Sequence, residues 1–222
     1  MSAFTPIDLY CERLGPDFWA EPLNALSNAA FLVAAWLAWR LARTRPQGVT
    51  LQGGVLIGMM ATIGVGSFLF HTLAVGWAMW ADVIPISVYQ LLFLVFYVRS
   101  VAGAPLWLTA ASVAAFFGTS AAFGALPAHW LNGSLSYGSA LVFIAGLGLW
   151  HWRTGRQAPW ALLGAASVFV VSLTFRSLDM WVCPHFSEGT HAVWHLLNGV
   201  VLYLTTCGFV FNEGRGTRPG RR

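Results

Sequence analysis

Long apolar stretches alternate with short polar segments along the whole chain. A helix needs roughly 20 residues to cross a hydrocarbon core of about 30 Å, and seven stretches come close to that length. They run over Leu23 to Leu41, Leu51 to His71, Asp82 to Val98, Leu106 to Phe123, Leu131 to Trp152, Ala158 to Asp179, and Thr190 to Phe211. The pattern predicts an all-α, polytopic membrane protein built as a bundle of seven transmembrane helices.

Composition points the same way. Of 222 residues, 57% are hydrophobic and only 9% are charged, which leaves too little polar surface to cover a soluble globule. We expect residues 1–222 to form a single membrane domain, with an outer acidic tail at 1–22 and an Arg-rich cytoplasmic tail at 212–222. An acidic rather than a basic segment precedes the first stretch, so no cleavable signal peptide is expected.

The arginines set the expected orientation. Lys is absent, and all twelve basic residues except Arg13 and Arg176 follow the first, third, fifth and seventh stretches. The positive-inside rule then puts the amino terminus outside and the carboxyl terminus in the cytoplasm. Abundant Ala, Gly and Arg without Lys indicate a GC-rich bacterial genome, and hence the inner membrane. The net charge of +4 is therefore a topology signal, and nothing in the sequence predicts nucleic-acid binding.

Polar residues that are costly in a membrane gather at one end of three stretches. Ser67 and His71 are four residues apart and share a helix face, and His191 and His195 have the same spacing. These two stretches run in opposite directions, so their polar ends meet on the outer side. Asp82 starts the third stretch after a short connection. We expect all five side chains at one depth.

Three neutral imidazoles suit a divalent transition ion, most often zinc, and leave a fourth coordination position for water, as in a catalytic site. Zinc lowers the pKa of such a water to about 7, and Asp82 is the candidate to accept and return a proton. Ser67 is the candidate to orient a substrate carbonyl or to donate to a developing oxyanion. The alternatives are separate core hydrogen bonds for each residue, or haem, which fits His191 and His195 less well because they share a face.

At these residues the chain resembles the alkaline ceramidase family, part of a superfamily of seven-helix membrane hydrolases that includes adiponectin-receptor-like proteins. The matching segments are residues 21–28, residues 66–71 with Asp82, and residues 191–195. The resemblance implies that His71, His191 and His195 bind zinc, with Ser67 and Asp82 beside it. It also implies hydrolysis of ceramide, or of a related N-acyl lipid, to a sphingoid base and a free fatty acid.

The acidic tail carries a second correspondence. The resemblance implies a calcium ion held by acidic side chains close to the first stretch. Glu12 and Glu21 match that pattern, Asp8 is displaced by one position, and Leu14 stands where an oxygen ligand is expected. Calcium takes about six to eight oxygens, so main-chain carbonyls would have to supply the missing one. The alternative is a solvated acidic tail.

The remaining polar residues have local interpretations. Cys11 and Cys183 lie on the predicted outer side, where an oxidising compartment permits a disulfide, and the resemblance implies this pairing. Cys207 is expected to be buried and unpaired. Arg176 and Asp179 are expected to form a local ion pair; the alternative is a contact that orients a metal-bound histidine. His129 and His151 are expected at the membrane interface.

Three functions follow. The leading one is a zinc-dependent lipid amidase whose partner is the membrane lipid itself. The second is a zinc-stabilised receptor or sensor without turnover. The third is a transporter or proton channel that uses Asp82 and the histidines as relay groups. The third expects a polar path to the inner face, whereas the stretches at 106–123 and 131–152 offer only scattered Ser, Thr and Asn.

Overall fold

The computed structural model of the chain describes residues 3–127 and 129–214. Within these ranges every regular element is helical, apart from an isolated β-bridge between Pro6 and Val75. The elements are α1 (Pro22–Ser27), α2 (Ala29–Arg43), α3 (Leu51–Leu73), α4 (Gly76–Phe96), η1 (Tyr97–Val101), α5 (Leu106–Gly124), η2 (Trp130–Tyr137), α6 (Gly138–Arg153), α7 (Ala161–Val182) and α8 (His191–Val210). The arginines predicted for a cytoplasmic tail, Arg215, Arg218, Arg221 and Arg222, lie outside the described residues.

Seven helical segments in the described ranges are long and apolar enough to cross a membrane. α1 continues into α2, α4 into η1, and η2 into α6, so ten elements make seven spans. The outside of the bundle is apolar, since Trp36, Trp107, Phe117 and Val170 are all exposed, as expected for surfaces that face lipid. The predicted all-α architecture with seven helices long and apolar enough to span a membrane is confirmed.

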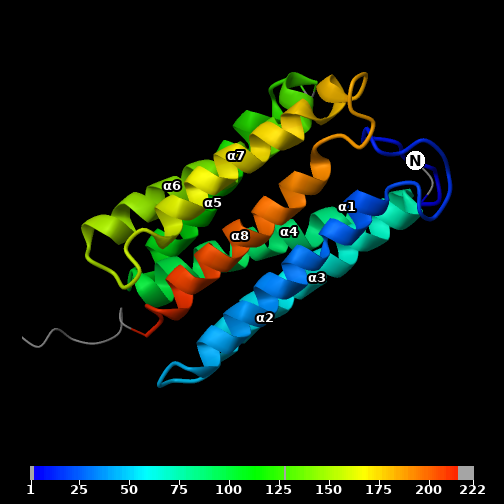
Figure 1. Ribbon diagram of the computed structural model, residues 1–222. Coiled ribbons are helices and arrows are strands. Elements are labelled where there is room, and N and C mark those ends of the chain that lie inside the picture. Colours follow the sequence, from blue (N-terminus) through cyan, green and yellow to red (C-terminus); the bar gives the residue numbers. More distant parts are fainter. Residues whose placement is uncertain (1–2, 128, 215–222) are drawn as a thin grey trace, which may run out of the picture.

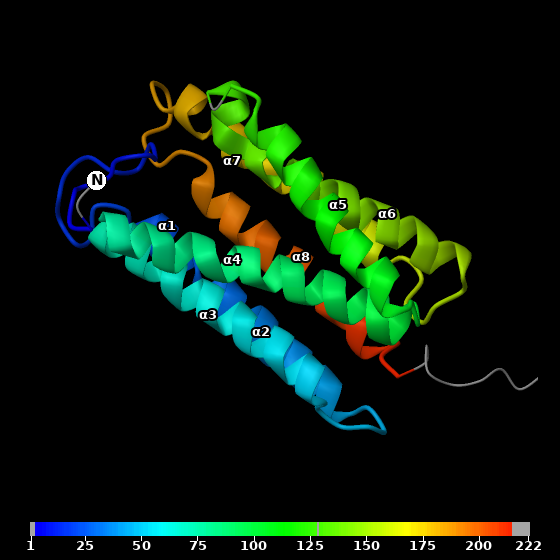
Figure 2. The same ribbon diagram turned by 180° about the vertical axis from the view of Figure 1, so that it is seen from behind.

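The spans form one elongated bundle (Figures 1 and 2). α3 packs along α4 and α7 along α8, while α2 contacts both α3 and α8. The chain reverses direction at each connection. The N-terminal tail (residues 3–21), the end of α3 and the beginnings of α4 and α8 therefore meet at one end of the bundle (Figure 1). α8 is the most buried span, and it brings two histidines to this end.

The hydrophobic pattern suggests that the third span starts at Asp82, but the structure places its start earlier. α4 begins at Gly76, so Asp82 lies inside a helix with a buried side chain. The connection can be this short because Ala74 ends α3 in the left-handed conformation, with φ of 45°. The fifth span also differs, because positive φ angles at 131–133 delay its continuous α-helix until Gly138.

A glycine allows α3 and α4 to touch beside Asp82. A Cβ atom on Gly66 would overlap the main-chain oxygen of Ala81, so no larger residue fits without separating the helices. Small residues commonly allow such close approach between membrane helices. The contact sets Ser67, the next residue of α3, level with Asp82 of α4.

His151 lies in the last turn of α6, at the end of the bundle opposite the N-terminal tail, and its side chain is fully buried. Its Nε2 lies 3.0 Å from the Gln157 carbonyl oxygen and 3.2 Å from that of Ala158, so Nε2 carries the proton and donates. Nδ1 then accepts a hydrogen bond from the Tyr97 hydroxyl. The imidazole can be buried because both of its nitrogens are paired.

Candidate metal centre

Three imidazoles converge at the end of the bundle that carries the N-terminal tail. His71 comes from the last turn of α3, whereas His191 and His195 come from the first two turns of α8. All three are essentially inaccessible to solvent, and one ligand nitrogen from each ring lies within 4.8 Å of the others. Among the described residues, this histidine cluster is the one group of three or more His, Cys, Asp or Glu side chains that could hold a metal ion.

Each ring of the histidine cluster has one nitrogen without a hydrogen-bond partner in the described part of the chain: His71 Nε2, His191 Nδ1 and His195 Nε2. A buried polar atom left unpaired is costly, and it is a signal for an ion or water at that place. Three imidazole nitrogens in close proximity are a donor set that divalent transition ions accept. The residues therefore fit a bound metal ion.

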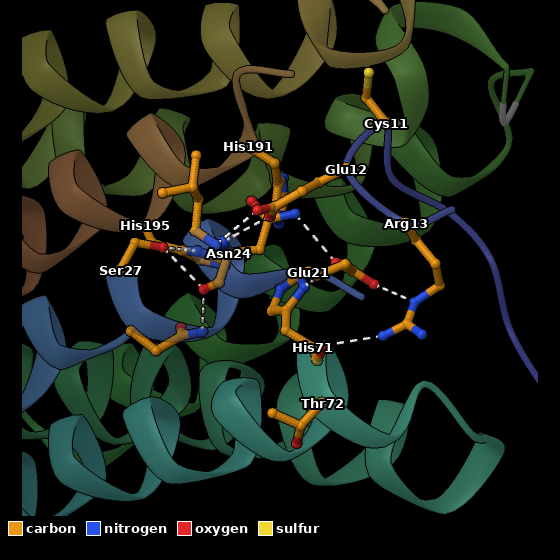
Figure 3. A network of polar contacts seen from close by, with 12 residues as sticks. Cys11, Glu12, Arg13, Glu21, Asn24, Ser27, His71, Thr72, His191 and His195 are labelled. Atoms are coloured by element: carbon orange, nitrogen blue, oxygen red, sulfur yellow. Dashed lines mark hydrogen bonds and ion pairs between the residues drawn. The ribbon is translucent and has the colours of Figure 1, made fainter. Parts of the chain in front are cut away.

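Neighbouring side chains fix the tautomers of two of these rings (Figure 3). His71 Nδ1 lies 2.6 Å from Glu21 Oε2, and a carboxylate can only accept, so Nδ1 carries the proton. His195 Nδ1 lies 2.8 Å from Ser27 Oγ, whose own hydrogen goes to the Asn24 carbonyl oxygen. His195 Nδ1 therefore donates as well. Both Nε2 atoms keep a free lone pair, as metal-ligating histidines require.

The helix α1 positions the two residues that orient these rings. Glu21 lies directly before α1, and Ser27 is its last residue. This short helix therefore holds Glu21 against His71 and Ser27 against His195. The sequence pattern predicts Glu21 as a calcium ligand and gives Ser27 no role. A signal was available, because both residues belong to the 21–28 segment that carries the family resemblance.

Asp82 and Ser67 lie next to the histidine cluster. The carboxylate of Asp82 is within electrostatic range of Ser67, His71 and Arg176. Both residues are buried, and Asp82 Oδ1 and Ser67 Oγ have no hydrogen-bond partner among the described residues. The structure thus brings all five residues of the predicted constellation to one place, with the Asp82 carboxylate and the Ser67 hydroxyl next to each other.

Of the residues predicted for calcium, Glu12 and Glu21 lie near each other, and both contact Asn24. Asp8 is exposed. The two oxygens of Glu12 accept the main-chain N–H groups of Leu23 at 2.6 Å and Asn24 at 2.8 Å, and burial raises the pKa of this carboxyl. Burial would also raise the pKa of Glu21, but hydrogen bonds from His71, Asn24 and Arg13 outweigh it and lower the pKa. Calcium binding by Asp8, Glu12 and Glu21 stays a prediction.

Arg176 and Asp179 do not form the predicted local ion pair; no ion pair joins them in the described part of the chain. Arg176 turns toward η2, where it donates to the Asn132 carbonyl oxygen and the Ser134 hydroxyl. Its guanidinium carbon lies 5.4 Å from the centre of the Tyr137 ring. The spacing of three residues on α7 does not bring the two charges together because each finds a better partner on another element.

Asp179 instead holds the beginning of α8. Its carboxylate accepts the main-chain N–H groups of Thr190 at 2.7 Å and His191 at 3.0 Å, which have no partner inside the helix. The preceding Gly189 has φ of +63°, and a Cβ there would overlap Asp179 Oδ1. The carboxylate therefore positions His191 through the main chain rather than through the imidazole.

The N-terminal tail covers the histidine cluster. A disulfide joins Cys11 to Cys183 after α7, as predicted, and the Cys11 N–H donates to Asp179. The ring of Tyr10 stacks on His191, with centroids 3.8 Å apart. Cys207 is buried and free, also as predicted. The tail is thus tied down directly over the candidate metal site.

An apolar pocket opens beside the histidine cluster, between the helices. Phe31, Tyr137 and Trp194 belong to its walls, and the Phe31 ring lies 6.1 Å from that of His195. Further walls are aromatic and aliphatic, including Phe93, Phe143, Leu147 and Phe169. Asn198 also lines the pocket, and its Nδ2 has no partner among the described residues. The pocket is thus lined mainly by apolar side chains and offers one hydrogen-bond donor.

No protein-family model and no curated protein matches the sequence, so the chemistry of this centre has to be inferred from its own residues.

Proposed function

We propose that the protein is a zinc-dependent membrane amidase that hydrolyses ceramide, or a related N-acyl lipid, to a sphingoid base and a free fatty acid. One observation carries the proposal: three buried imidazole nitrogens lie beside the Asp82 Oδ1 and Ser67 Oγ atoms, and none of the five atoms has a hydrogen-bond partner in the described part of the chain. The same residues carry the resemblance to the alkaline ceramidase family. An all-imidazole ligand set favours zinc over the hard cations, which prefer oxygen.

Zinc in this ligand set supplies a Lewis acid and lowers the pKa of a bound water. The Asp82 carboxylate accepts a proton from the water that attacks the amide carbon, and it returns this proton to the leaving amine as the C–N bond breaks. The Ser67 hydroxyl donates a hydrogen bond to the amide oxygen while negative charge develops on it. Glu21 and Ser27 hold two imidazoles in the tautomer that the reaction needs.

The apolar pocket supports a lipid substrate. Its walls beside His195 would hold the acyl chain, while the unpaired Nδ2 of Asn198 would donate to an oxygen of the lipid. The N-terminal tail, with Tyr10 stacked on His191, limits access of bulk water from the end of the bundle. Exclusion of water strengthens the electrostatic interactions on which the reaction depends.

We also propose that the histidine cluster faces the outer side of a bacterial inner membrane. Arg40, Arg43, Arg99 and Arg153 lie at or near the ends of α2, η1 and α6. These helix ends are opposite the histidine cluster (Figure 1). The positive-inside rule puts them in the cytoplasm. An oxidising outer compartment also accounts for the Cys11–Cys183 disulfide.

A zinc-stabilised receptor or sensor is the second candidate. The disulfide-tied tail over the histidine cluster favours it, because a covered site suits a structural ion. This function, however, gives no role to the buried Asp82 carboxylate and Ser67 hydroxyl beside the histidines.

One experiment distinguishes the two candidates. Metal-stripped protein and zinc-reloaded protein are each incubated in detergent with ceramides of different acyl length. The amidase releases sphingoid base, quantified by mass spectrometry, only after zinc is restored. Protein that rebinds zinc but releases no sphingoid base or other amine product is the receptor, and the amidase proposal is then wrong.

A further inference from the structure

We infer that Arg13 is a positioning residue of the metal centre: its guanidinium is a cation built into the N-terminal tail that holds Glu21 against His71, so that no calcium ion is needed there. The inference depends on a metal ion in the histidine cluster, but not on which reaction that metal serves.

Arg13 holds His71 in two ways (Figure 3). Its Nε forms an ion pair with Glu21 Oε1, and the other oxygen of that carboxylate lies 2.6 Å from His71 Nδ1. Its NH2 also donates to the main-chain oxygen of His71 at 2.9 Å. The imidazole and the main chain of one metal ligand are thus both fixed from the same guanidinium.

The arrangement is buried, which makes it specific. Arg13 is 7% exposed and Glu21 is 2% exposed. A buried carboxylate without its cation is costly, whereas the planar guanidinium donates in several fixed directions at once. The third contact, from NH1 to the Gly15 carbonyl oxygen at 3.0 Å, shapes the tail around the same group. If Arg13 is lost, Glu21 carries an unpaired negative charge and His71 loses its fixed orientation.

The same contacts leave little for calcium to bind. Glu21 already accepts from Arg13, Asn24 and His71, and both oxygens of Glu12 accept main-chain N–H groups at the beginning of α1. Calcium needs about six to eight oxygen ligands, and it would have to displace these donors next to a fixed positive charge. Arg13 supplies the positive charge that the Glu21 carboxylate needs.

Zinc release tests the inference without any activity assay. Zinc-loaded parent protein, Arg13→Met, Arg13→Lys and Glu21→Gln are mixed with a chromophoric chelator, in calcium-free buffer and in buffer with calcium chloride. Arg99→Met is the matched control, because Arg99 also donates to a main-chain carbonyl but lies near the opposite end of the bundle. A residue that orients a metal-bound histidine changes metal affinity by about 10- to 100-fold.

We expect Arg13→Met to release zinc about 10 to 100 times faster than the parent, Arg13→Lys to fall between them, and Arg99→Met to match the parent. Because Arg13 acts through Glu21, the double variant with Glu21→Gln should release zinc no faster than the faster single variant. Calcium should not change the parent's rate. Cobalt-substituted Arg13→Lys should show a shifted d–d spectrum, which a general loss of stability would not produce.

Parent-like zinc release by Arg13→Met overturns the inference, as does a parent whose zinc is retained only with calcium. If Arg13→Met does not fold, Arg13→Lys and its cobalt spectrum decide the question. The outcomes also separate this inference from the proposed function. If Arg13→Met loses zinc rapidly but the parent never cleaves ceramide, only the amidase proposal is refuted. If the parent cleaves ceramide but Arg13→Met retains zinc as the parent does, only the role of Arg13 is refuted.

Discussion

Tyr10 stacks on His191 with ring centroids 3.8 Å apart and an angle of 24° between the planes. The first residue belongs to the N-terminal tail and the second to the last helix, so the contact joins the two ends of the described chain at the histidine cluster. The neighbouring Cys11 is covalently bound to Cys183. The tail is therefore part of the candidate site rather than an appendage to it, and it contributes Tyr10, Arg13 and Glu21.

Asp82→Asn should abolish amide hydrolysis while zinc stays bound. The amide is close in size to the carboxylate, but it cannot accept and return a proton, and removal of general acid–base catalysis costs about 10²- to 10⁴-fold in rate. Product release and zinc content are measured on the same sample. Asp17→Asn, at an exposed tail position, is the control that should behave as the parent. Full activity of Asp82→Asn would refute the proposed role of Asp82.

Gly66→Ala should destabilise the bundle. The added methyl group meets the Ala81 main-chain oxygen, and α3 and α4 must separate, at a cost of about 1–3 kcal/mol for an overpacked contact. The measurement is the midpoint of thermal unfolding in detergent. Gly118→Ala in α5 is the matched control, because beyond its own stretch of helix no atom of the described chain lies within 4 Å of its Cβ position. Equal midpoints for both variants would contradict the close approach of α3 and α4.

Thiol counting tests the covalent attachment of the tail. The chain has three cysteines, and the structure pairs Cys11 with Cys183. Denatured protein should therefore react with one equivalent of a thiol reagent before reduction and with three after it. Reduction should also lower the midpoint of thermal unfolding, because the tail is released from the site. Three reactive thiols without prior reduction would show that the disulfide does not form.

The hydrophobic pattern predicts all seven spans, because membrane-spanning length and apolar composition are properties of each segment alone. It misplaces the beginning of the third span, since a charge usually marks the end of a transmembrane helix. Asp82 breaks this rule because Ser67 and His71 of the neighbouring helix interact with its carboxylate. A buried charge is tolerated where polar side chains surround it. Here those side chains come from another helix, so the hydrophobic pattern of one segment cannot reveal them.

The metal-ligand spacing is visible in the sequence, since it depends on the helical repeat. The contacts that orient the ligands are not. Arg13 and Glu21 lie in an irregular segment without periodicity, so nothing local predicts that Arg13 contacts the His71 carbonyl oxygen. The Arg176–Asp179 ion pair is also absent from the described contacts, because Asp179 accepts hydrogen bonds from the N–H groups at the beginning of α8 instead. These N–H groups are distant in sequence, so the local spacing does not reveal them.

The most direct test of a zinc-dependent amidase compares His195→Ala with His185→Ala, with zinc content and amide hydrolysis measured on the same preparations. His195 is fully buried in the histidine cluster, whereas His185 is exposed outside it. We predict that the parent and His185→Ala hold zinc and release sphingoid base, and that His195→Ala loses both properties together. Hydrolysis by His195→Ala at the parent's rate, or a parent that hydrolyses ceramide without bound metal, would contradict the proposal.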